Sequence, residues 1–248
     1  MNKICCFGDG YAANHIWPEW PAIVSALYPE TNFINYGAVG AGNEFISSAI
    51  VQEHKKNPNA IFLVQWAQSN RFDKLLEDAT WNQTIDSDRT YHFNRVKLND
   101  QTWWLSSAST QEPVRYYHQH YIQLQQAQLR TFNSIYFAAN LLSKNGIFFS
   151  TYKLNFTPDQ WADLQCVPWI DIAMADYASQ SCFTKIRQQE VQPSPPVQMQ
   201  WVVEKVLPQM PRQPTPTRLT ELNRRINAEN WNPYDPDREE IWAKLIDF

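Results

Sequence analysis

Short apolar runs alternate with amphipathic stretches along the first 151 residues of the chain. Four of these runs are largely apolar at successive positions and lack the strict alternation of a strand that faces water on one side. Continuous apolar character of this kind is typical of strands that are buried on both faces of a sheet. The predicted strands cover residues 4–7, 32–36, 61–66 and 147–151.

Helical patterns separate these strands, with apolar residues spaced three or four positions apart. Strands that alternate with helices form a parallel sheet through right-handed crossovers. The chain is therefore expected to be an α/β protein, with its ligand crevice beyond the carboxyl ends of the strands. The predicted helices cover residues 20–27, 43–53, 117–144 and 238–246.

Two segments interrupt this pattern within what is expected to be a single domain over residues 1–248. Residues 73–116 contain several aromatic residues among polar ones and are interpreted as an inserted cap with a hairpin. Their rings would serve either as a wall for a sugar or acyl ligand or as the cap's own core. Residues 192–217 are rich in proline and are expected to form an extended excursion that contains one short helix over residues 199–206. The excursion would be either a structural meander or a partner-binding arm.

Composition narrows the functional classes. The formal charge is −4 without a basic run, which argues against nucleic acid as a partner. No stretch approaches the roughly 18 apolar residues of a membrane span, and the first strand is too short for a signal peptide, so a cytoplasmic location without membrane contact is expected. The four cysteines form no C-x-x-C motif, and neither a metal nor another cofactor is expected.

Three polar motifs follow the first three predicted strands. The first is Gly8-Asp9-Gly10, and the second is the glycine-rich stretch 35–43, which opens a helix and so offers an anion or oxyanion site. The third, residues 65–73, contains Asn70 as a donor to an oxyanion, and Arg71 either as a clamp for a carboxylate or phosphate or as an ion-pair partner of Asp9 or Asp73. The ligand-binding candidates are Asp9, Gly40, Asn43, Asn70 and Arg71.

The order and spacing of these motifs resemble the SGNH (GDSL-type) hydrolases, in particular the divergent proteins of this kind carried by tailed bacteriophages. The resemblance covers residues 1–73, and 117–153 by pattern only. It implies a three-layer α/β/α, flavodoxin-like fold. It places the family's nucleophilic serine at Gly10, its oxyanion glycine at Gly40 and its oxyanion asparagine at Asn70.

Both reactive groups of that family are missing from their expected positions. Gly10 has no side chain, and the family's Asp-x-x-His block, assigned to residues 231–242, contains aspartates but no histidine. Because nucleophile and base act together, the resemblance implies a catalytically degenerate protein with a site at Asp9, Gly10, Gly40 and Asn70. Replacement groups considered from the sequence are Asp9, Cys6, Ser69, His15, and the pair His118 and His120.

The expected function is a binding or structural module that retains the crevice and binds a carbohydrate or acyl ligand, or protein partners in an assembly. As an assembly component, the protein would be incorporated in a virion instead of remaining free in the cytoplasm. The alternative function is an active esterase or deacetylase on acylated carbohydrate that uses a nucleophile other than the family's serine.

Overall fold

A computed structural model describes residues 3–13, 18–76, 93–98, 101–106, 123–171, 173–179, 184–187, 190–229, 231 and 237–248. Its central element is a four-stranded sheet in which all neighbouring strands run parallel, in the order β2-β1-β3-β7. This confirms the predicted sheet, with the first strand in its interior. The strands are β1 (Lys3–Phe7), β2 (Asn32–Asn35), β3 (Ile61–Trp66) and β7 (Gly146–Ser150).

A fifth strand position is reduced to a single residue beside β7. Trp169 forms a parallel bridge with Phe148. The backbone N–H of Phe148 donates to the carbonyl of Pro168 at 2.9 Å, and that of Ile170 donates to the carbonyl of Phe148 at 2.8 Å. The chain therefore returns to the sheet edge after β7, over too short a length to leave a strand pattern in the sequence.

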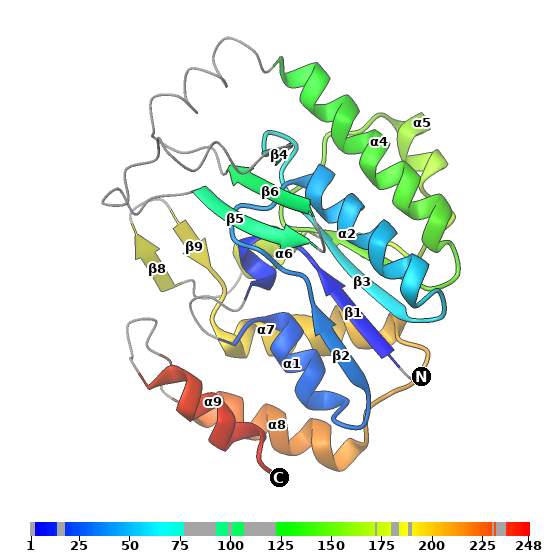
Figure 1. Cartoon of the computed structure of the whole chain (residues 1–248). Helices are drawn as coiled ribbons and strands as arrows, with labels where there is room; N and C mark the ends of the chain where they lie inside the picture. The colour runs from blue at the N-terminus through cyan, green and yellow to red at the C-terminus, as the bar shows by residue number, and fades with distance from the viewer. Residues whose placement is uncertain are drawn as a thin grey trace.

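Helices cover both faces of the sheet, which accounts for the continuous apolar runs (Figure 1). Ile4 and Cys6 of β1 belong to the core shared with α1 (Trp20–Leu27) and α7 (Pro195–Trp201). Cys5 and Phe7 belong to the core on the opposite face, under α2 (Asn43–Lys56) and α4 (Leu124–Leu142). The architecture is an α/β/α arrangement, as expected.

The predicted helices are largely confirmed. α1 begins and ends as predicted, and so does α9 (Arg238–Ile246), whereas α2 continues three residues beyond its predicted end. α4 occupies the inner part of the predicted 117–144 helix, and residues 117–122 lie outside the described part of the chain. The remaining helices along this part of the chain are α5 (Pro158–Asp163) and α6 (Met174–Ser179).

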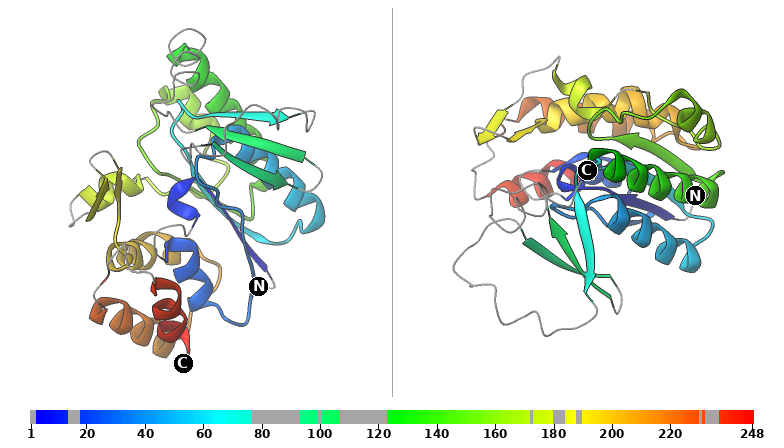
Figure 2. Two further views of the ribbon diagram at one scale, coloured as in Figure 1. Left: turned by 60° about the vertical axis from the view of Figure 1, so that its left-hand side comes forward. Right: turned by 90° about the horizontal axis from the view of Figure 1, so that it is seen from above.

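A separate antiparallel sheet follows β3, in the order β4-β6-β5, and stands to one side of the parallel sheet (Figure 2). β5 (Phe93–Leu98) and β6 (Gln101–Ser106) pair as the expected hairpin, and β4 (Phe72–Leu76) pairs with β6. Trp103 is buried and packs edge-on against Phe45 of α2, with ring centroids 5.9 Å apart. This ring is thus part of the main core, while Trp81 and Tyr91 lie outside the described residues.

The proline-rich segment contains more helix than the one short stretch predicted at residues 199–206, and less extended chain than its composition suggested. Residues 195–209 are helical throughout, as α7, a π-helical turn (Val202–Val206) and a 3-10 turn (Leu207–Gln209). Pro195 and Pro196 occupy the first turn of α7, where a missing N–H costs no hydrogen bond. Trp201 at the end of α7 is fully buried, so this segment forms part of the core. Ahead of it, β8 (Thr184–Arg187) and β9 (Glu190–Gln192) pair antiparallel.

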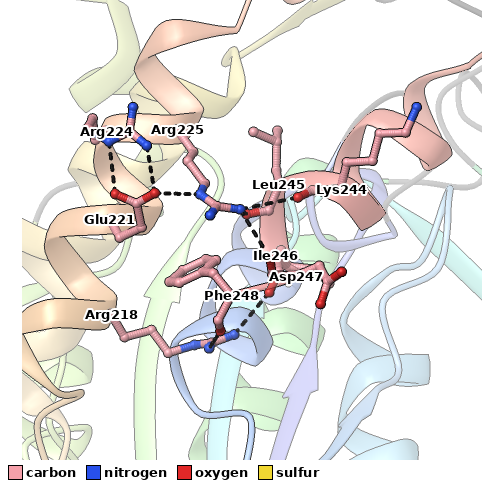
Figure 3. A network of polar contacts seen from close by, with 9 residues as sticks. All are labelled: Arg218, Glu221, Arg224, Arg225, Lys244, Leu245, Ile246, Asp247 and Phe248. Atoms are coloured by element: carbon pink, nitrogen blue, oxygen red, sulfur yellow. Dashed lines mark hydrogen bonds and ion pairs between the residues drawn. The ribbon is translucent and has the colours of Figure 1, made fainter.

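Arginines of α8 (Pro216–Ala228) hold α9 in place (Figure 3). Arg225 donates to the carbonyl oxygens of Lys244, Leu245 and Asp247 at 3.2–3.3 Å. The guanidinium groups of Arg218 and Arg225 lie 4.5 and 4.4 Å from the centroid of the Phe248 ring. Cations at the carbonyl end of a helix satisfy its free acceptors and its dipole.

Among the described helices, none is long and apolar enough to span a bilayer.

Candidate functional site

The turns that follow β1, β2 and β3 are joined to one another at the carboxyl edge of the sheet. Ala38 donates its backbone N–H to the carbonyl of Gly8 at 3.1 Å. The Asn43 side chain accepts from the N–H of Ala67 at 2.8 Å and donates to its carbonyl at 3.1 Å. These bonds bring the segments that contain Gly10, Gly40 and Asn70 to the same edge, as the order of motifs predicted.

Asp9 is fully buried, with a hydrogen bond at one carboxylate oxygen and an ion pair, but no hydrogen bond from the described residues, at the other. Its Oδ1 accepts from the backbone N–H of Tyr11 at 3.0 Å and so caps the short 3-10 helix Gly10–Ala12. Its Oδ2 lies 3.3 Å from Nη2 of Arg71. Of the partners considered for Arg71 in the sequence, the structure therefore places Asp9 beside it. Gly10, the first residue of the 3-10 helix, offers no side chain to this arrangement.

The amino terminus of α2, which the sequence suggested as an open anion site, is filled by a carboxylate of the chain itself. Asp73 accepts from the backbone N–H of Gly42 at 2.8 Å and from that of Phe45 at 2.9 Å. A Cβ atom at Gly42 would lie 2.7 Å from Oδ2 of Asp73, so any larger residue there would force this carboxylate or the backbone to shift. Burial raises the pKa of Asp73 from its ordinary 3.8 to about 7, although both hydrogen bonds act in the opposite direction.

The other ligand candidates differ in whether their polar groups already have hydrogen-bond partners within the chain. Asn43 is buried, and besides its bonds to Ala67 its amide donates to Oγ1 of Thr131 at 3.1 Å. Gly40 adopts φ 84°, a left-handed conformation that favours glycine, in the turn before α2. Asn70 is half-buried, and its Oδ1 is a buried atom without a hydrogen-bond partner among the residues that the structure describes.

The replacement groups suggested by the sequence are not assembled into a reactive set in the described structure. Cys6 is fully buried, and burial raises the pKa of its thiol well above the ordinary value, so it remains protonated at neutral pH. Ser69 is half-buried in the turn after β3. His15, His118 and His120 lie outside the described residues.

Gln65 connects this edge to the chain that follows β7. Its Oε1 accepts from the indole N–H of Trp20 at 2.7 Å, and its Nε2 donates to Oγ1 of Thr151 at 3.0 Å. Nε2 also lies 3.7 Å from the sulfur of Met174. This buried glutamine, which the sequence offered only as part of the third motif, thus holds three distant segments together.

Another aspartate lies beyond β7, apart from the fourth block that was assigned from the sequence. Asp171 and Met174 follow the single-residue strand position at Trp169, so an aspartate is followed three residues later by a buried methionine. Residues 232–236 of the block assigned from sequence lie outside the described chain, and α9 beyond them packs on α8, away from α2 and α4 (Figure 1). The sequence analysis missed the 169–174 stretch because one bridged residue leaves no strand pattern.

A pocket of about 620 Å³ opens beyond the carboxyl end of β7. Tyr152, which lies between the lining residues Ser150 and Lys153, has its hydroxyl group 3.1 Å from that of Tyr11 in the turn after β1. No motif predicted the pocket, because its residues come from the end of β7, from the short helices α5 and α6, and from the loops between them. Its lining includes Ser150, Lys153, Trp161, Gln165, Trp169 and Asp171. Within the described residues, no group of three or more histidine, cysteine, aspartate or glutamate side chains is placed to hold a metal ion.

The fold is a parallel α/β sheet with helices on both faces. No protein-family model matches the chain, and no curated protein matches it. Among solved structures, it is similar to the crystal structure of a member of the lipolytic protein G-D-S-L family from Veillonella parvula DSM 2008. The two are 14% identical, with a TM-score of 0.42, over 80% of this chain and 92% of that one. A likeness at this level assigns neither a residue nor an activity.

Proposed function

We propose that this chain is an SGNH-like protein that binds a ligand at the carboxyl edge of its sheet without hydrolysing it. The observation that carries the proposal is the engagement of Asp9 beside Gly10. One oxygen of Asp9 caps the following turn and the other lies against Arg71, while Gly10 has no nucleophilic atom. Acyl transfer by a serine-type mechanism requires a nucleophile and a base within hydrogen-bond reach of each other.

The position of the described histidine supports the same conclusion. His54 lies in the last turn of α2, with its ring 5.9 Å from that of Phe62. The first turn of α2 is the end that contacts Ala67 and Asp73 at the carboxyl edge. His54 is therefore at the opposite end of the helix and cannot act as a base for a group at position 10.

Turnover of p-nitrophenyl acetate and of acetylated xylan tests the proposal. The wild type, Gly10→Ser and Asp9→Ala are all expected at buffer background, because Gly10→Ser supplies a hydroxyl without a base. Asp163→Ala serves as the matched control, since Asp163 is an exposed carboxylate at the end of α5. Circular dichroism verifies that each variant is folded.

Wild-type turnover well above background would contradict the proposal. If Asp9→Ala abolished that turnover and Asp163→Ala preserved it, Asp9 would be a catalytic group, and the chain an esterase with a nucleophile other than serine at position 10.

A further inference from the structure

We infer that the pocket beyond β7 is a binding site for a neutral oligosaccharide, and that a row of aromatic rings on the adjoining surface extends it. The inference rests on the proposed binding function and names its ligand class. The pocket combines two half-buried tryptophans, Trp161 and Trp169, with side chains that donate and accept hydrogen bonds. A pyranose ring presents the same two features, an apolar C–H face and a rim of hydroxyl groups.

The polar lining is suited to hydroxyl groups. Asp171 and Asp176 offer acceptors, Lys153 offers donors, and Gln165 offers both. All four side chains line the pocket and are exposed. Ser150 adds a hydroxyl group at the pocket floor, where β7 ends. A fatty acyl chain would offer these groups no hydrogen bonds on binding, and desolvating them would cost free energy. A mixed set of acidic, basic and amide groups therefore favours a neutral polyhydroxyl ligand over an aliphatic one.

An aromatic row leads from this pocket onto the exposed surface of α4. Consecutive rings have centroids 5.1, 5.3, 5.5 and 5.7 Å apart. Four of these rings are half-buried, and Tyr136 at the far end is 43% exposed. In order from the pocket, the aromatic row is Trp169, Trp161, Phe156, Phe132 and Tyr136.

The length of the aromatic row indicates an oligosaccharide rather than a single sugar. Four of the rings pack against the core on this side of the sheet, yet each remains only half-buried, and the row extends over four segments of the chain: α4, the stretch before α5, α5 itself and the stretch after it. Exposed aromatic surface of this extent commonly marks an interaction site. Short sugars would occupy the pocket alone, and longer ones would also contact Tyr136.

Isothermal titration with hexasaccharides and disaccharides of the β-1,4-glucan, α-1,4-glucan, chitin and xylan series tests the inference. At least one hexasaccharide is expected to bind. Trp161→Ala is expected to lower the affinity for both the hexasaccharide and the disaccharide by about tenfold or more, as for a central aromatic anchor. Tyr136→Ala is expected to lower the affinity for the hexasaccharide several-fold and to leave the affinity for the disaccharide unchanged. Asp171→Asn is expected to lower the affinity for both sugar lengths.

Two matched controls separate local from general effects. Trp231→Ala removes a half-buried tryptophan that packs at α8, and Asp163→Asn removes an exposed carboxylate on α5 that does not line the pocket. Both are expected to bind as the wild type. Absence of binding for all eight sugars, equal losses in the controls, or binding of a medium-chain fatty acid in place of sugars would each overturn the inference.

The two proposals fail in different experiments. Sugar binding together with ester turnover would leave the pocket assignment intact and contradict the non-hydrolytic function. Background turnover without sugar binding would leave the non-hydrolytic function intact and overturn the pocket assignment.

Discussion

At the scale of single residues, polar groups at the sheet edge serve mainly to join the turns to one another. The sequence predicted that Asp9, Asn43, Asn70 and Arg71 would come to this edge, because each follows a strand. It left open whether Arg71 would pair with Asp9 or contact a ligand, and it gave no sign that Asp73 would occupy the start of α2. Such pairings depend on distances between loops, which no local pattern encodes.

Gly42→Ala is expected to destabilise the chain through a clash with Asp73. The added Cβ would lie 2.7 Å from Oδ2 and 3.0 Å from Cγ of Asp73, so the carboxylate or the start of α2 must shift. A loss of about 1–3 kcal/mol in the free energy of unfolding is expected, as for other overpacked buried positions. Urea denaturation measures it. The same substitution made in an Asp73→Ala background is the control, and an equal loss there would show that the clash is not the cause.

The unusual titration of Asp73 gives a pH-dependent contribution to stability. Its folded pKa of about 7 lies above the ordinary 3.8, so between these values the folded chain holds a proton that the unfolded chain has released. The contribution of Asp73 to stability is therefore fully present below about pH 4 and is lost as the pH rises through 7. The stability difference between the wild type and Asp73→Asn, measured by urea denaturation, is expected to favour the wild type increasingly from pH 7 to pH 4. A difference independent of pH would contradict this.

At the scale of elements, apolar continuity and helical spacing predicted the four parallel strands and the helices around them. The predicted helix over residues 199–206 is confirmed, but the prediction was wrong for residues 195–198 and 207–209, where proline content was given more weight than position. Proline breaks a helix in its interior, but Pro195 and Pro196 stand in the first turn, and the following residues have an apolar face that the core requires. The strand position at Trp169 was missed because it consists of a single bridge.

Arg225→Met is expected to loosen α9 from α8. The substitution removes hydrogen bonds to three carbonyl groups near the end of α9 and the cation over the Phe248 ring, while it keeps the aliphatic stem. The free energy of unfolding is expected to fall by about 1–2 kcal/mol, and the amide hydrogens of α9 are expected to exchange faster.

Arg224→Met is the matched control for this effect. Arg224 is exposed and bonds only to Glu221 among the contacts drawn in Figure 3. Its removal should change stability by less than about 0.5 kcal/mol. If both variants exchanged amide hydrogens in α9 at the same rate, the carbonyl contacts of Arg225 would not be what holds the helix.

At the scale of the whole molecule, the parallel sheet is the shared wall of two cores. Phe149 and Trp201 pack against each other on one face, with ring centroids 4.6 Å apart, and Trp20 lies 5.1 Å from Phe149. Phe148 faces the other core, beside Trp66. Because alternate residues of one strand enter different cores, the two layers of helices are coupled through the sheet. The sequence predicted this sandwich, but not that a segment near residue 200 would complete the core begun by β1 and α1.

Trp201→Ala is expected to destabilise the whole chain rather than release its carboxyl-terminal part alone. The side chain is fully buried between Trp20 and Phe149, so truncation leaves a large cavity at the centre of one core. A loss of about 3–5 kcal/mol is expected, with a single unfolding transition seen both by circular dichroism and by tryptophan fluorescence. Phe137→Ala on α4, where the ring is 53% exposed, is the control and should change stability by no more than about 0.5 kcal/mol. Two separate transitions in Trp201→Ala, with the sheet melting after α7 and α8, would show instead that the carboxyl-terminal helices form an independent unit.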